Sequence, residues 1–191
     1  MRPVERESRG FLRPGQELVM AGYAGQEGSR RIAQARAGEL SAWFAGDYIE
    51  QMLRDMGIAT DDSIPWQEYG ASEWEAVGEG GIFTALWNLS GAYRLGFEVD
   101  LYRIPIRQET VELCERYDLN PYRLYSRCVL AASDHGNRLA ARLDREGIPA
   151  AVIGTVREGI KREICYGRVR GFLERPREDE LYKIWKQEAV L

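Results

Sequence analysis

The segment Gly78–Trp87, with the sequence GEGGIFTALW, joins a glycine-rich turn to an amphipathic helix. After the turn, Ile82, Leu86 and Leu89 recur at steps of three and four residues, which predicts one buried helix face. The glycines leave the backbone N–H groups of the first helical turn uncovered. Together with the helix dipole, these groups favour an anion such as phosphate or carboxylate. The alternative is a helix start that needs glycine only for close packing or a positive φ angle.

A second glycine-rich loop follows the apolar stretch Glu17–Ala21, which is expected to form a buried strand. Its glycines, Gly22, Gly25 and Gly28, are spaced by three residues, a pattern that lets a backbone turn tightly and approach a ligand. The loop is not a Walker A motif, because no Gly-Lys-Ser/Thr follows, and it is not the dinucleotide fingerprint. It therefore adds a second candidate anion site without identifying the ligand.

Strands alternate with helices along the chain, which indicates an α/β or α+β layered sheet in one domain. We expect residues 1–15 to form an N-terminal arm, residues 16–191 a single domain, and residues from about 29 to 66 a helical insertion in it. In the insertion, Ser29 is expected to cap a short helix, and a longer helix is expected over Glu39–Met56. Further strands are expected at 97–102, 128–132 and 150–156, a hairpin at 160–173, and helices at 108–117, 136–146 and 177–187.

The composition limits the classes of partner. The chain has 191 residues, of which 45% are hydrophobic, and a net charge of −4. This mild acidity, without a long lysine or arginine tract, argues against nucleic-acid binding. The apolar runs are too short to span a bilayer, and residues 1–10 carry no apolar signal-peptide core. We therefore expect a cytoplasmic protein with no membrane partner.

Cysteine, histidine and paired carboxylates give only weak signals for metal or catalytic chemistry. His135 lies in a polar segment and is expected to be a solvated loop residue rather than a catalyst. Asp61 and Asp62 offer hard oxygen ligands, but adjacent loop carboxylates are usually just solvated, and no metal site is predicted. Wide spacing without a CxxC pair predicts reduced, mostly buried thiols at the three cysteines, Cys114, Cys128 and Cys165.

These motifs, in this order, resemble the C-terminal domain of the aminoimidazole ribonucleotide (AIR) synthetase superfamily. The superfamily includes the purine-pathway synthetase, selenophosphate synthetase, thiamine-monophosphate kinase and the hydrogenase maturation protein E. The resemblance implies a three-layer α/β/α domain with a mixed sheet. It covers about Gln16–Val156 and rests on both glycine loops and on four further points of the chain: Ile104-Pro105, Cys114, Asn120-Pro121 and Ile153-Gly154.

The resemblance also implies a second domain. In full-length members an N-terminal domain supplies acidic residues that bind Mg and ATP, and the nucleotide lies between the two domains. The chemistry is phosphoryl transfer, which depends on positioning and charge neutralisation. Only 15 residues precede the matched region here, so we expect this chain to lack that domain and to have no autonomous catalysis. It would bind phosphate, or ATP with Mg, only together with a partner domain.

The sequence departs from the family pattern at residues that would orient a ligand. Where the family has His-Asp-x-Thr, residues 75–78 read Glu-Ala-Val-Gly. Asn88 stands where glutamate is usual, and Glu27 replaces a histidine. Arg127 and Cys128 stand in place of a Ser-Gly pair. The ligand-binding residues expected from the glycine loops and the resemblance are Gly22, Gly25, Gly28, Glu75, Gly78, Glu79, Gly80, Gly81 and Asn88.

Three hypotheses for the function follow. The first is an interaction module without autonomous catalysis, which acts as a homodimer or with another protein. The second is half of a split, hydrogenase-maturation-like phosphoryl-transfer enzyme, completed by a separately encoded ATP-binding-domain protein that docks on the Gly78–Gly81 face. The third is a sensor that binds a nucleotide or small anion at the glycine loops, with Arg103 or Arg127 as counter-charge.

Overall fold

A mixed β-sheet forms the centre of the computed structural model, which describes residues 10–58 and 63–188. In this part of the chain the sheet has seven strands in the order β2-β4-β1-β5-β3-β6-β7. Neighbouring strands are antiparallel, except that β3 and β6 run parallel. The strands are β1 Glu17–Ala21, β2 Ala71–Val77, β3 Gly96–Asp100, β4 Cys128–Ser133, β5 Ala150–Arg157, β6 Arg162–Tyr166 and β7 Val169–Phe172.

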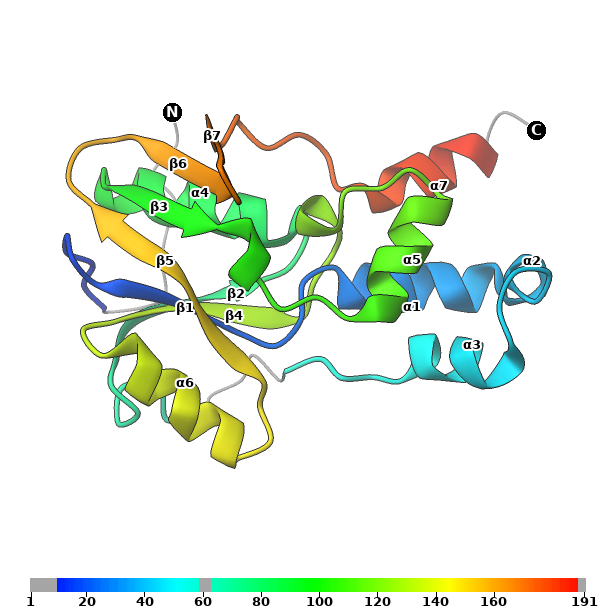
Figure 1. Ribbon diagram of the computed structural model, residues 1–191, viewed down its shortest axis with the longest axis horizontal. Helices are drawn as coiled ribbons and strands as arrows, with labels where there is room; N and C mark the ends of the chain where they lie inside the picture. Colours follow the sequence, from blue (N-terminus) through cyan, green and yellow to red (C-terminus); the bar gives the residue numbers. More distant parts are fainter. Residues whose placement is uncertain (1–9, 59–62, 189–191) are drawn as a thin grey trace.

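Helices cover both faces of the sheet and extend the molecule at one end (Figure 1). Helix α4 (Gly81–Tyr93) lies on one face and α6 (Gly136–Arg145) on the other, so the predicted α+β fold with three layers is confirmed. The other helices gather beyond one end of the sheet and are called the helical cluster: α1 Gln26–Ala35, α2 Ala37–Leu40, α3 Gly46–Leu53, α5 Gln108–Arg116 and α7 Leu181–Glu188. Two short 3₁₀ helices, η1 Leu101–Arg103 and η2 Pro121–Arg123, lie in the connections.

Strand β1 contributes to the hydrophobic core on both faces of the sheet. Leu18 and Met20 point to the face where Ile82 of α4 is buried. Val19 points to the opposite face and joins the cluster that contains Leu139 of α6. Successive side chains of a strand alternate between its faces, so a strand covered on both sides is apolar throughout. This explains the continuous apolar run that predicted β1.

A third hydrophobic cluster holds the helical cluster together. It includes Ile32 of α1, Met52 of α3, Leu113 of α5 and Ile184 of α7, all buried. Leu124, which follows η2, belongs to the same cluster. Helices from the region expected to be an insertion therefore pack against helices that lie far away in sequence.

Two helix predictions between residues 29 and 56 are wrong. Helix α1 begins at Gln26 and has Gly25 as its N-cap, so Ser29 lies inside the helix rather than at its cap. The Ser29 hydroxyl donates to the Gln26 carbonyl at 2.9 Å and therefore cannot cap the N-terminus. The single helix expected over Glu39–Met56 is two helices, α2 and α3, with residues 41–45 in a turn between them.

Strand β2 is absent from the sequence prediction because its side chains break the usual alternation. Glu73 is fully buried in this strand, where an apolar residue would be expected. Its carboxylate accepts a hydrogen bond from the Tyr93 hydroxyl of α4, a partner that is 20 residues away in sequence. The other predicted strands and helices are present with small shifts of their ends. Most of the predicted N-terminal arm, residues 1–9, lies outside the described residues, as do Asp61 and Asp62.

Candidate functional site

The two glycine turns lie against the same short segment of the chain, residues 120–126. Gly81, at the start of α4, has φ +61°, and a Cβ atom there would lie 2.5 Å from the Tyr122 carbonyl oxygen. Gly28 in α1 meets the same segment from the other side, since a Cβ atom would lie 2.4 Å from Leu124 Cγ. A Cβ atom essentially never comes this close to another atom, so the Tyr122 backbone or the Leu124 side chain would have to shift. These glycines are therefore needed for close packing, as the alternative reading of the sequence states.

Hydrogen bonds to the hydroxyl and the backbone N–H of Ser126 join the two turns. The Gly25 N–H donates to Ser126 Oγ at 2.8 Å, and the Ser126 N–H donates to the Gly78 carbonyl at 3.2 Å. The Gly28 N–H donates to the Tyr125 carbonyl at 2.8 Å. Three of the predicted glycines are thus connected within one buried network. Their polar backbone groups bond to the chain itself.

The anion seat at the start of α4 is occupied by a carboxylate of the same chain. Asp179 Oδ2 accepts a hydrogen bond from the Gly80 N–H at 2.6 Å. Its other oxygen accepts from the Leu181 N–H at 2.8 Å, at the start of α7, and from the Tyr125 N–H at 3.3 Å. Asp179 is only 4% exposed. The glycine turn therefore does bind an anion, as its geometry predicts, but the anion is a side chain from the C-terminal segment.

Burial of Asp179 sets its electrostatics. Desolvation raises the pKa of this carboxyl above its ordinary value, although the three backbone hydrogen bonds act in the opposite direction. The nearby carboxylate of Glu79 adds to the increase. Sequence reasoning missed Asp179 because this residue falls inside the terminal helix expected over 177–187, whereas α7 begins only at Leu181. No local pattern indicates its contact with Gly80.

Of the other predicted site residues, Glu79 lies beside this turn, whereas Asn88, Glu75 and Gly22 do not converge on it. Glu79 is exposed and accepts a hydrogen bond from the Tyr182 hydroxyl. Asn88 is half-buried on α4, about 10 Å along the helix axis from Gly81 by the usual rise per residue. Glu75 is half-buried on β2. Gly22 lies at the end of β1, where its N–H donates to the Pro149 carbonyl at 2.7 Å.

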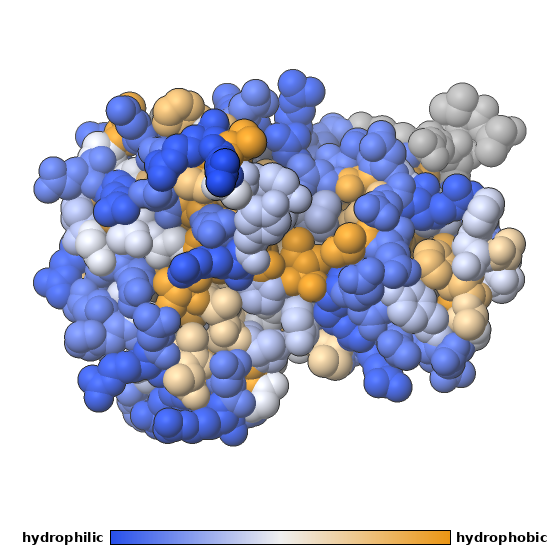
Figure 2. All heavy atoms as spheres, in the orientation of Figure 1, coloured by the Kyte–Doolittle hydropathy of each residue, from blue (hydrophilic) through white to orange (hydrophobic). Residues whose placement is uncertain are grey.

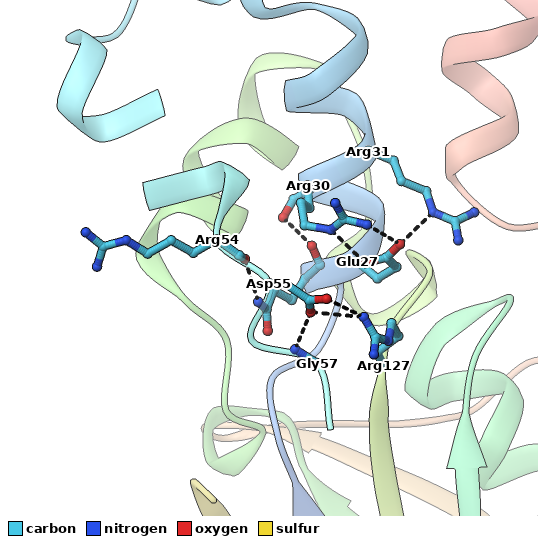
Figure 3. A network of polar contacts seen from close by, with 9 residues as sticks. Glu27, Arg30, Arg31, Arg54, Asp55, Gly57 and Arg127 are labelled. Atoms are coloured by element: carbon cyan, nitrogen blue, oxygen red, sulfur yellow. Dashed lines mark hydrogen bonds and ion pairs between the residues drawn. The ribbon is translucent and has the colours of Figure 1, made fainter. Parts of the chain in front are cut away.

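Arginines near the first glycine loop are paired with carboxylates (Figure 3). The buried Glu27 accepts hydrogen bonds from Arg30 at 2.9 Å and from Arg31 at 2.8 Å. Burial opposes ionisation of Glu27, but the bonds from the two arginines prevail and lower the pKa of its carboxyl. Arg127 forms an ion pair with Asp55 at 2.7 Å.

The arginines proposed as counter-charges for a sensor are thus engaged elsewhere. Arg127 is bound to Asp55, and Arg103 forms an ion pair with Asp100 at 3.7 Å. Neither pair belongs to the hydrogen bonds that surround Gly80 and Gly81.

The thiols are poorly suited to chemistry. Cys114 and Cys128 are free and buried, and Cys165 is free and half-buried, in agreement with the sequence prediction. Burial raises the pKa of Cys114 to about 12 and raises that of Cys128 further, so both stay protonated. In residues 10–58 and 63–188 no three histidine, cysteine or carboxylate side chains come together as a metal site would require.

The fold and this site define an α+β domain in which the glycine turns form hydrogen bonds with other parts of the same chain. Residues 13–164, most of the sequence, match the family described as "AIR synthase related protein, C-terminal domain". The chain belongs to this family, which confirms the resemblance found in the sequence. A comparison with curated proteins finds no match.

Solved structures share the fold. E. coli HypE, a hydrogenase maturation protein, is 20% identical, and the match covers 90% of this chain and 53% of that chain with a TM-score of 0.69. The HypE–HypF complex is 15% identical, and the match covers 86% of this chain and 54% of that chain with a TM-score of 0.62. AaThiL complexed with AMPPCP and TMP is 18% identical, and the match covers 91% of this chain and 53% of that chain with a TM-score of 0.60. These identities are low and show the fold alone.

This chain spans about half the length of each of these structures. The activities of the whole proteins therefore do not transfer to it directly. In the part of the chain that the structure describes, every helix is too short or too polar to cross a bilayer.

Proposed function

We propose that this domain is a cytoplasmic binding or interaction module that has no autonomous catalysis. One observation carries the proposal: Asp179 holds the Gly80 N–H, the group that an anionic substrate would need at the α4 turn. Gly81, the next residue, is packed against the carbonyl oxygens of Tyr122 and Leu124. The free cysteines fit a reducing compartment.

A protein partner is favoured by exposed apolar side chains at one edge of the sheet. Within the described residues, β7 forms this edge and pairs only with β6. Edge strands present unpaired backbone groups to which another chain can add. Large side chains at and beside this hairpin are more than half exposed: Tyr102, Ile160, Tyr166, Val169 and Phe172. Figure 2 also shows hydrophobic side chains between the sheet and the helical cluster, on a face that is mostly hydrophilic.

Light scattering tests this proposal directly. We expect a stable dimer whose mass does not change with Mg-ATP, and no ATP turnover by the chain alone. Phe172→Asp at the β7 edge should shift the protein to a monomer, because it places a charge in the apolar contact. The matched control is Met56→Asp, at an exposed residue three positions after the end of α3, and it should leave the dimer intact. ATP turnover by the purified chain would overturn the proposal.

The alternative is half of a split phosphoryl-transfer enzyme. It is supported by the match to about half of the HypE and ThiL structures. In that case a separate ATP-binding-domain protein would dock on the Gly78–Gly81 face, and Asp179 would have to leave Gly80. Co-purification of such a protein, with ATP turnover that appears only in the mixture, would favour this alternative over the module.

A further inference from the structure

A pocket of about 800 Å³ lies on the α6 side of the sheet, away from the glycine turns. It is formed by the turn before β2, the β4–α6 turn and one face of α6. The residues that matter for its chemistry are Tyr69, Ser133, His135, Arg138, Arg142 and Arg145. Its volume is in the range of small-molecule sites.

Helix α6 presents three arginines to this pocket. Arg138, Arg142 and Arg145 are spaced by four and three residues, so they share one helix face. The opposite face is buried in the core through Leu139 and Leu143. The packing of α6 on the sheet therefore fixes the position of the arginine face.

None of these three arginines forms an ion pair with a carboxylate in the described part of the chain. Arg142 lies over the Tyr69 ring, 4.0 Å from its centroid, and the Tyr69 hydroxyl donates to Glu146. Arg138 and Arg145 make no ion pair with a described residue. Two free guanidinium groups in one pocket are therefore available for an external anion.

The acidic residues at the pocket do not cancel this positive charge. Asp134 is bound by Arg13 and also accepts a hydrogen bond from Gln16 at 3.1 Å. Glu68 is the other carboxylate in the lining. Three arginines against one unengaged carboxylate give a positive wall, in a chain whose net charge is −4. Such a local reversal of charge attracts anions.

An aromatic pocket adjoins the positive one. It has a volume of about 270 Å³ and shares Gly70 and Asp134 with the larger pocket. Phe11, which is 55% exposed, and Trp74 form its walls. Trp74 is half-buried against the core, and the Arg13 guanidinium lies 5.8 Å from the centroid of the Phe11 ring. Aromatic side chains at a pocket wall can stack with planar rings.

We propose that these joined pockets bind a small phosphate ester that carries a planar ring. The phosphate lies against Arg138 and Arg145, and the ring lies against Phe11 and Trp74. Arginine is well suited to phosphate because its planar donors match the phosphate oxygens. The site is separate from the Gly78–Gly81 turn, so it is independent of the function proposed above.

Titration calorimetry on the full chain tests the site with three probes: AMP, ribose 5-phosphate and inorganic phosphate. We expect saturable binding of AMP, weaker binding of the other two, and a decline with salt concentration. The double variant Arg138→Gln/Arg145→Gln should weaken AMP binding about tenfold or more, since it removes two charge-assisted contacts. The matched control is Arg168→Gln/Arg175→Gln, which makes the same change of charge at exposed arginines elsewhere.

Phe11→Ala separates the ring contact from the phosphate contact. It should weaken AMP but leave ribose 5-phosphate unchanged, and thermal unfolding of each variant checks that the fold is retained. The proposal is overturned if AMP shows no saturable binding, or if the control pair weakens it as much as the α6 pair. Equal affinity for AMP and ribose 5-phosphate would overturn the assignment of the ring. If the double variant fails to fold, the salt dependence of AMP binding to the unmodified chain decides the point. AMP affinity that does not change with salt concentration would overturn the contact with the arginines.

Discussion

Removal of the Asp179 carboxylate tests whether the α4 turn depends on its internal anion. Asp179→Ala leaves the N–H groups of Gly80, Tyr125 and Leu181 without their acceptor. A hydrogen bond to a charged group contributes about 1.5–3 kcal/mol, and the bond from Tyr125, at 3.3 Å, is the weakest of the three. The cost of burying the carboxylate offsets part of this sum, so we expect a net loss of about 3 kcal/mol.

For a chain of this size that loss corresponds to a decrease in unfolding temperature of roughly 6–12 °C. Differential scanning calorimetry measures it. Glu174→Ala is the matched control, because it removes the same charge from an exposed residue of the same C-terminal segment. Asp179→Asn should cost less than Asp179→Ala, since its carbonyl oxygen still accepts from Tyr125 and Leu181. An Asp179→Ala melting temperature equal to that of Glu174→Ala would refute the reasoning.

The pH dependence of the same residue has a definite sign. The pKa of Asp179 is raised in the folded protein above its ordinary value of 3.8. The native state therefore holds this proton more tightly than the unfolded state, and the associated stability is greatest below the unfolded pKa. It is lost as pH rises through the raised folded pKa. As pH rises through the folded pKa, the difference in unfolding free energy between wild type and Asp179→Asn should become smaller. Urea titrations at several pH values measure this difference.

Three further predictions concern packing, charge and thiols. Gly81→Ala should lower the free energy of unfolding by more than about 2 kcal/mol, which is more than Gly147→Ala should cost. Both glycines have a positive φ angle, but only at Gly81 would a Cβ atom meet a carbonyl oxygen. Urea unfolding of the two variants measures the difference. The pKa of Glu27 is lowered in the folded protein, so the stability that its ionised carboxylate contributes is present above pH 4.5 and is lost as pH falls through the folded pKa. A Glu27→Gln variant that remained as much less stable than wild type in acid as at neutral pH would contradict this. In the native protein a small thiol reagent should modify Cys165 first and reach buried Cys128 only after unfolding, as mass spectrometry against time would show.

Much of the fold could be predicted because its signals are local. The apolar run Glu17–Ala21, the periodic residues of α4 and the turn about Gly167 each depend on neighbouring residues. Strand β2 could not be predicted, because Glu73 is buried there through a hydrogen bond to a distant tyrosine. The break between α2 and α3 was also missed, since the apolar stripe continues through it.

The sequence by itself determined that Gly80 and Gly81 open a helix and leave backbone donors able to hold an anion. That result follows from backbone geometry, which a local stretch of residues sets. Only the tertiary structure decided which anion occupies the turn, and that three arginines of α6 face a pocket on the other side of the sheet. Asp179 lies 99 residues from Gly80, and no local pattern connects them. The two meet because the hydrophobic packing of α7 in the helical cluster brings the C-terminal segment to the start of α4.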